Sequence, residues 1–394
     1  MKNDDNTVLL HAVGDVSPRR LDYGEPAESL FAQVADKIQE ADISLCQLEC
    51  NLSTKGGLQY RNYVTWYGRA HPDNVKCLVH AGFTLVTHAS NHSFDYGPDA
   101  LLETIEVLQR HGIAVVGVGK NIEEARRPAI IERNGTKVAF LNYNSVLPDE
   151  YEAREEKPGC APIKASTYYE AQEYQAGTPP RVITIPREED VAAMEEDIRQ
   201  AKTKADVVVV SMHWGIHHIP GLLADYQFTV GHRAIDAGAD LILGTHAHLL
   251  KGIEIYKGKA IFFSLGNFAQ ETPHHLKPPA GAFSSLWGPK YGHSKHEPGA
   301  RYNKQPDKRY TMMVRCVIKD KELQLVSFIP GWINELAAPR LLTRREPEFQ
   351  EVVDYMDRWC KELGTDLSVQ GDEVVVCPQQ GSIARREASN EAAF

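Results

Sequence analysis

The sequence lacks the features that mark several common classes of protein. Its seven cysteines are odd in number and scattered without a Cys-x-x-Cys pair, so neither a disulfide framework nor a zinc ribbon is indicated. No apolar run reaches the length of a membrane-spanning helix or forms the core of a signal peptide. A net charge of −10 leaves no basic excess for nucleic acid. We therefore expect a cytoplasmic protein with mostly reduced cysteines, no membrane segment and no nucleic-acid partner.

The sequence does contain short apolar runs, each followed by a residue of metal-ligand type. With 394 residues and 42% hydrophobic content, the chain can bury a substantial core. Runs at 8–13, 43–48, 83–87, 207–212 and 241–243 predict buried strands. In α/β sheets, ligands bind beyond the carboxyl ends of parallel strands. The residues expected to meet there as a two-metal site are Asp15, Glu49, Asn91, His213, His246 and His248.

The remaining pattern predicts strands alternating with helices. Helices are expected at 28–41, 72–81, 98–109, 188–202, 222–237 and 347–362. Strands at 260–263, 312–318 and 323–328 are expected to form an antiparallel group within a mixed second sheet. We predict a main domain at 1–335, with an insertion at 146–180 and a lid at 270–310, followed by a helical extension and polar tail at 336–394.

The chemistry of the six candidate ligands favours divalent metal. His246 and His248 are two apart on an extended segment, so both imidazoles project to the same side. Taken singly, such residues often serve as rim polar groups or helix caps, and only their combination indicates a metal centre. A carboxylate bridging two cations would offset their repulsion. Mixed carboxylate, amide and imidazole donors suit two ions of manganese, iron or zinc.

Next to Asn91, the sequence offers a candidate for proton transfer. An imidazole such as that of His92 can give or take a proton at neutral pH, and Asp95 is placed to orient it. A site that served only structure would need no such pair, so the pair favours an enzyme.

At this point the sequence resembles a known family. Its blocks are Gly14-Asp15…Arg20, Leu48-Glu49-x-Asn51-Leu52, Ser90-Asn91-His92-x-x-Asp95-x-Gly97, His213-Trp214-Gly215, Gly244-Thr-His246-Ala-His248, Glu254-Ile-Tyr256 and Ser264-Leu-Gly-Asn267-Phe268. They are similar to the signature blocks of CapA-type poly-γ-glutamate capsule synthesis proteins, within the calcineurin-like metallophosphoesterase superfamily. The resemblance implies an α/β fold of four layers, two mixed sheets flanked by helices. It also implies the six residues above as metal ligands and His92 as the proton-transfer residue.

Some positions depart from the related proteins. Ser17 stands where the phosphatases carry a histidine, which weakens the first metal site. His217, followed by His218, stands where capsule proteins usually carry a glutamate. The expected substrate contacts are Arg20, Asn51 and His217. For Arg20, an ordinary salt bridge is an equally good interpretation. His293 and His296 of the lid are candidates for a second acid or base.

The sequence leaves three functions open. The leading hypothesis is hydrolysis of an amide, γ-glutamyl or peptide, or of a phosphoester, in a substrate bearing carboxylate or phosphate, with His92 protonating the leaving group. The second is peptide epimerisation, in which His92 and a lid histidine exchange a Cα proton from opposite faces. The third is a metal-stabilised component of a biosynthetic complex without catalysis.

Overall fold

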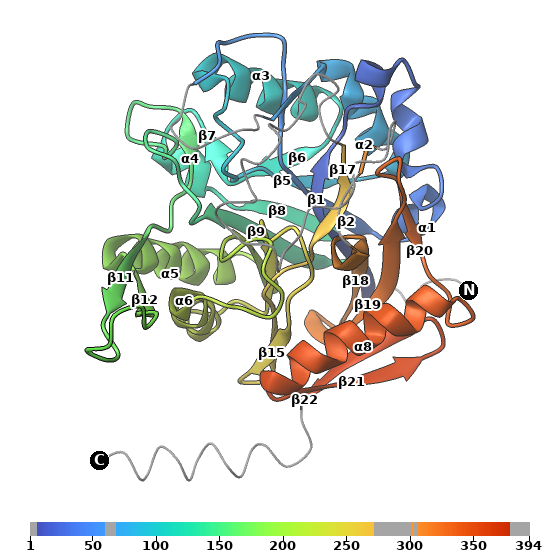
Figure 1. The fold of residues 1–394 in the computed structure, drawn as a ribbon. Coiled ribbons are helices and arrows are strands. Elements are labelled where there is room, and N and C mark those ends of the chain that lie inside the picture. Colours follow the sequence, from blue (N-terminus) through green and yellow to red (C-terminus); the bar gives the residue numbers. More distant parts are fainter. Residues whose placement is uncertain (1–5, 60–67, 272–300, 303–305, 379–394) are drawn as a thin grey trace.

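Two mixed β-sheets form the centre of the molecule (Figure 1). The computed structural model describes residues 6–59, 68–271, 301–302 and 306–378. In spatial order, the larger sheet contains β21 (Thr365–Gln370), β22 (Glu373–Pro378), β19 (Glu322–Ile333), β18 (Tyr310–Lys319), β1 (Thr7–Ser17), β2 (Ile43–Leu48), β5 (Leu85–Thr87) and β6 (Ala114–Val116), with β17 (Asn267–Gln270) paired to β1 and β20 (Pro339–Leu341) to β19.

The second sheet has six strands and packs its inner face against the first. Its spatial order is β15 (Ile253–Tyr256), β16 (Lys259–Phe262), β14 (Leu241–Thr245), β13 (Val207–His213), β9 (Thr136–Asn144) and β8 (Ala129–Arg133). Leu10 of β1 and Phe140 of β9 belong to one buried cluster that both sheets share. Three two-stranded ribbons complete the strands: β3 (Asn51–Leu52) with β4 (Arg69–Ala70), β7 (Val118–Gly119) with β10 (Gly159–Cys160), and β11 (Ala165–Glu170) with β12 (Arg181–Pro186).

Helices cover the outer face of each sheet. The short η2 (Ala27–Phe31) and the helices α1 (Ala35–Gln39), α2 (Val75–Ala81) and α3 (Gly97–Arg110) lie on the larger sheet, whereas α4 (Ile122–Arg126), α5 (Glu188–Lys202) and α6 (Asp225–Asp236) lie on the smaller one. On α3, buried Leu101, Thr104 and Leu108 recur at the spacing of one helix face. The predicted α/β architecture, two mixed sheets between layers of helices, is confirmed.

The C-terminal segment joins the larger sheet. Helix α8 (Pro347–Glu362) contributes Phe349, Val352 and Met356 to the core between the sheets. The strands β21 and β22 then extend the larger sheet through β19, and the sequence analysis did not predict them. The domain boundary at residue 335 stays a prediction. The predicted lid at 270–310, with His293 and His296, falls mostly outside the described residues.

The predicted antiparallel grouping of the three late strands is confirmed for β18 and β19 and wrong for β16. β16 pairs with β14 and β15 in the smaller sheet, whereas β18 and β19 join the larger sheet beside β1. A long stretch of chain separates β16 from β18 in the sequence. Their order along the chain therefore did not predict which strands pair. The predicted helix at 28–41 is two elements, η2 and α1, because the chain leaves helical geometry at Val34. Among the described strands, β12 pairs only with β11.

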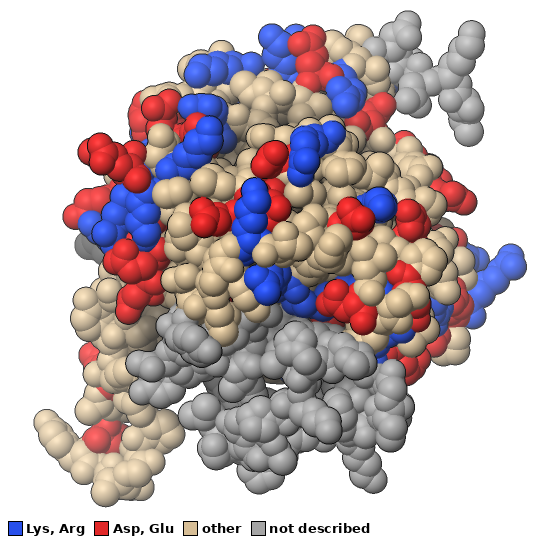
Figure 2. All heavy atoms as spheres, turned by 90° about the horizontal axis from the view of Figure 1, so that it is seen from above, with Lys and Arg blue, Asp and Glu red and all other residues tan. Residues whose placement is uncertain are grey.

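The surface and the thiols complete the description. On the face in Figure 2, Lys and Arg side chains are interspersed with Asp and Glu side chains. No helix in the described part of the chain is long and apolar enough to cross a bilayer. All seven cysteines are free, and all but Cys377 are buried, as expected for reduced core residues.

Candidate metal centre

The six predicted ligands lie at the carboxyl ends of strands from both sheets. In the larger sheet, Asp15 lies near the end of β1, and Glu49 and Asn91 follow β2 and β5. In the smaller sheet, His213 ends β13, whereas His246 and His248 follow β14. Because the sheets pack face to face, donors far apart in sequence meet at one rim.

Glu49 is shared by two groups of candidate ligands. One group joins Glu49 with His213 and His246, and the other joins it with Asp15 and His248. Glu49 Oε1 lies 3.7 Å from His213 Nε2 and 3.6 Å from His248 Nε2. A carboxylate oxygen between two imidazoles has the placement of a bridging ligand.

Asn91 adds a neutral oxygen to the first group. Its Oδ1 lies 2.8 Å from His213 Nε2, so both atoms face the same point. The structure therefore brings all six residues together. Their roles as ligands stay predictions, because proximity alone does not show coordination.

The buried donors fit a divalent cation. Asp15 and Glu49 have no exposed surface, and two buried carboxylates side by side are costly without positive charge nearby. Burial and the neighbouring imidazoles hold the pKa of His213 and His246 well below the ordinary value, which favours the neutral form that binds metal. Within the described residues, buried His246 Nδ1 has no hydrogen-bond partner. A divalent ion would complement these groups.

The backbone around the centre is strained where the ligands project. His246 and His248 adopt positive φ angles of 83° and 56°, which non-glycine residues rarely do. At Gly14, a Cβ atom would collide with the carbonyl oxygen of Gly266, whose oxygen accepts a hydrogen bond from Asp15 N at 3.0 Å. Glycine at position 14 therefore permits the close approach that places Asp15.

Side chains outside the predicted set hold the ligands. Asn267 Oδ1 lies 2.8 Å from His248 Nδ1, and Asn267 Nδ2 donates to the Tyr302 hydroxyl at 2.7 Å. That orientation makes Asn267 Oδ1 the acceptor, so His248 carries its proton on Nδ1 and its lone pair on Nε2, facing Glu49. Gln270 Nε2 donates to Glu49 Oε2 at 2.6 Å.

Some of these supporting residues lie in the sequence blocks that were recognised, and others do not. Asn267 belongs to the Ser264–Phe268 block of the sequence and lies at the start of β17. Thr245, whose Oγ1 lies 3.0 Å from His213 Nδ1, sits inside the His-x-His block and was overlooked. Gln270 and Tyr302 were missed because their positions depend on strand β17 lying beside β1.

His92 and Asp95 form a buried pair next to the ligands. His92 Nδ1 lies 2.7 Å from Asp95 Oδ2, which also accepts from Gly68 N at 2.6 Å. Asp95 Oδ1 accepts from the Tyr151 hydroxyl at 2.9 Å. With its carboxylate fixed by these donors, Asp95 holds the proton of His92 on Nδ1 and leaves Nε2 as the atom with the lone pair.

The predicted substrate contacts occupy different environments. Arg20 is buried and pairs with Glu25 at 3.2 Å and Glu271 at 3.3 Å, which is the salt-bridge alternative. Asn51 Nδ2 donates to Ser93 O at 2.7 Å, in the segment that carries His92. The His217 ring lies 5.0 Å from that of His246, at the centre itself. Of the three, only His217 is placed beside the ligands.

Loop 214–224, which carries His217 and His218, is held from two sides. His218 N donates to Ala247 O at 2.9 Å. Lys251 Nζ donates to Leu222 O at 2.8 Å and to Ile219 O. The ring of Trp359 on α8 fills the space where a Cβ atom would stand on Gly221. The C-terminal helix therefore supports the loop that brings His217 to the centre.

The comparisons with known proteins converge on one family. The model for the bacterial capsule synthesis protein PGA_cap matches residues 9–272, which include all six candidate ligands, His92 and Asp95. The PGA biosynthesis protein CapA of Bacillus subtilis is 30% identical over 201 residues, 51% of this chain and 46% of its own. A probable polyglutamine synthesis accessory protein of Mycobacterium tuberculosis is 31% identical over 238 residues, 58% of this chain and 56% of its own.

The matches differ in how much of each protein they cover. The chain spans about half the length of the curated relatives it matches. Among solved structures, a calcineurin-like phosphoesterase from Bacillus subtilis covers 81% of this chain and 88% of its own, at 16% identity and a TM-score of 0.38. That TM-score is too low to carry an argument, so the fold rests on the sheets described above.

Proposed function

This chain belongs to the bacterial capsule synthesis protein family PGA_cap, and on that premise we propose that it is a metal-dependent hydrolase of an amide bond in an acidic, glutamyl-type substrate. One observation carries the proposal: a shared buried carboxylate, Glu49, lies between two groups of donors, with the His92–Asp95 pair beside them. The first feature suits cations and the second suits proton transfer.

Two divalent ions of manganese, iron or zinc would be held by the six donors. His213, His246 and Asn91 would hold one, Asp15 and His248 the other, and Glu49 would contact both. When bound, such ions act as Lewis acids on a carbonyl or phosphoryl oxygen and lower the pKa of water. The mixture of oxygen and nitrogen donors supports a transition metal over calcium or magnesium.

In this proposal, His92 delivers the proton that the leaving group needs. A protonated His92 gives its Nε2 proton to the departing nitrogen or oxygen, and the carboxylate of Asp95 stabilises the imidazolium through Nδ1. Tyr151 and Gly68 N, which both donate to Asp95, keep that carboxylate in place. Each of these bonds orients the proton donor before the substrate arrives.

The substrate class is proposed from the relatives and the rim of the site. The relative named for PGA biosynthesis, together with the poly-γ-glutamate resemblance of the sequence, suggests a polymer rich in carboxylates. His217 beside His246 offers an imidazole where a substrate carboxylate would approach. A phosphoester substrate is the second prospect within the same chemistry.

Incubation of γ-glutamyl oligomers with the metal-loaded protein in heavy water tests the proposal. Cleavage without deuterium at Cα supports hydrolysis. Deuterium at Cα without cleavage would replace hydrolysis with epimerisation, for which His217 would be a candidate second base. Neither reaction, with these oligomers or with phosphoester substrates, would favour the non-catalytic component of a biosynthetic complex.

A further inference from the structure

A cavity on the outer side of the smaller sheet is lined by charged side chains that the metal centre does not use. Its volume is about 350 Å³, within the range of about 300 to 1,000 Å³ typical of small-molecule sites. Its walls come from α4, the start of α5 and the insertion at 146–180, and none of its lining residues is a candidate metal ligand. The cavity is therefore a separate place in the molecule.

The cationic side chains of the cavity keep unused hydrogen-bond donors. Arg154 donates to Glu150 and Glu152 through Nη2 only, and Arg187 donates to Glu189 through Nε only. Their other guanidinium N–H groups make no hydrogen bond to any described residue. Guanidinium groups bind carboxylates through two such N–H groups at once. The cavity can therefore bind carboxylates without breaking the existing ion pairs.

The carboxylate of Asp190, in the cavity wall, has no cationic partner among the described residues. Asp190 accepts a hydrogen bond from Lys164 N at 2.9 Å through Oδ2, but across the described residues it forms no salt bridge. Glu152, in contrast, lies 3.0 Å from both Arg154 Nη2 and Lys164 Nζ. Burial raises the pKa of Glu152, but hydrogen bonds from these two cations outweigh it and lower the pKa to about 2. The charge of Glu152 is thus already compensated by two cations, whereas Asp190 has room for a cationic partner from a ligand.

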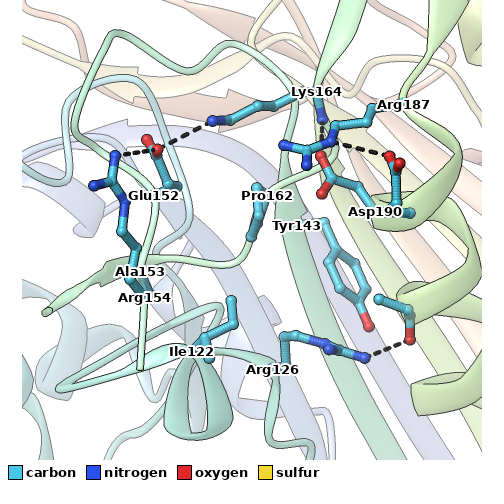
Figure 3. Close-up of a pocket in the computed structure, with 12 residues that line it drawn as sticks. Ile122, Arg126, Tyr143, Glu152, Ala153, Arg154, Pro162, Lys164, Arg187 and Asp190 are labelled. Carbon is cyan, nitrogen blue, oxygen red and sulfur yellow. Dashed lines mark hydrogen bonds and ion pairs between the residues drawn. The ribbon is translucent and has the colours of Figure 1, made fainter. Parts of the chain in front are cut away.

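The charges stand on opposite sides of an apolar floor. In Figure 3, Glu152 and Arg154 lie on one side and Arg187 and Asp190 on the other, with Pro162 between them and Tyr143 below Arg187 and Asp190. A ligand that spans the floor would meet guanidinium groups at both ends and a carboxylate at one end. That pattern matches a molecule with two carboxylates and one ammonium group.

We propose that this cavity binds an acidic α-amino acid, or the end of a short acidic peptide. The ammonium group contacts Asp190, the adjacent carboxylate contacts Arg187, and the distal carboxylate contacts Arg154 and Lys164 across the floor. The proposal concerns binding alone and does not rest on catalysis at the metal centre.

Calorimetric titration of the full chain with L-glutamate tests the proposal, with glutarate and L-glutamine as matched probes. Glutarate lacks the ammonium group and L-glutamine lacks the distal charge, so both should bind about tenfold more weakly or worse. Arg154→Ala and Arg187→Ala should each weaken L-glutamate by roughly tenfold, the value of one charged hydrogen bond. Arg127→Ala is the control, since Arg127 is exposed and outside the cavity, and its affinity should stay within about twofold.

Further measurements distinguish binding in the cavity from binding at the metal centre, and distinguish a lost contact from an unfolded variant. The affinity should survive chelation of metal and the His248→Ala substitution, and thermal unfolding should show that each arginine variant is folded. The proposal is overturned if L-glutamate does not bind saturably at millimolar concentration, if glutarate binds as tightly, or if binding depends on His248 but not on Arg154 and Arg187.

Discussion

At the scale of single residues, His92 is the side chain with the clearest proposed task. Substitution of His92 by Asn should lower turnover of the γ-glutamyl substrate by about 10² to 10⁴, the usual contribution of a general acid or base. Metal content should not change, because His92 lies outside both donor groups. Exposed His80→Asn is the matched control and should leave turnover intact. Loss of metal together with turnover in the His92 variant would make His92 a ligand.

His11 should make the fold sensitive to acid. It is buried in β1, and desolvation and nearby Arg315 lower its pKa from 6.5 to about 4. Because the folded pKa lies below the unfolded one, the unfolded chain binds more protons between these values. The stability that neutral His11 provides is therefore present above about pH 6.5 and lost as the pH falls toward 4.

Replacing His11 by Leu removes this titration. From pH 7 to pH 5, the wild type should lose about 2 kcal/mol more unfolding free energy than His11→Leu, as measured in urea at both pH values. Equal losses in the two proteins would show that His11 does not titrate in this range.

Single residues also show how far the sequence could predict the site. The six candidate ligands, His92 and Asp95 could be proposed from the sequence because each comes at or after the end of an apolar run and belongs to a recognisable block. Arg20 could not be assigned, since its partner Glu271 is distant in sequence and no local pattern reports it. Gln270 reaches Glu49 only through the pairing of β17 with β1, which the sequence did not reveal.

At the scale of elements, α8 acts as a support for loop 214–224. Trp359→Ala should remove the ring that packs over Gly221 and destabilise the protein by roughly 2 kcal/mol, less than a fully buried tryptophan would cost. The loop should loosen, so turnover should fall while metal content is kept. Arg358→Ala, on the exposed side of the same helix, is the control. Urea unfolding and a turnover assay would refute this role if Trp359→Ala matched the wild type in both stability and turnover.

Elements were predicted best where one periodic pattern dominates. Helix α5 spans Glu188–Lys202 as expected, because its buried residues Val191, Met194 and Ile198 follow the helical period. The β8–β9 hairpin was not predicted, although Asn134-Gly135 at its turn is a strong hairpin signal. The strands β21 and β22 were missed although they form a local hairpin, and only β22 pairs with the distant strand β19.

At the scale of the whole molecule, the centre exists only because two sheets meet. The larger sheet contributes two carboxylates and an amide, and the smaller one contributes three imidazoles. Neither sheet alone offers a complete set of ligands. Binding of cations should therefore stabilise the packing of the sheets against each other, and chelation should lower the melting temperature of the wild type. An unchanged melting temperature after chelation would contradict this coupling.

Elemental analysis of the purified protein and two variants tests the central claim most directly. Wild type should carry close to two divalent transition-metal ions per chain. His246→Ala, which removes a donor from one group, should carry close to one, and Glu49→Ala, which removes the shared donor, should carry almost none. A wild type without bound metal, or a Glu49→Ala variant that keeps two ions, would contradict a centre built around Glu49.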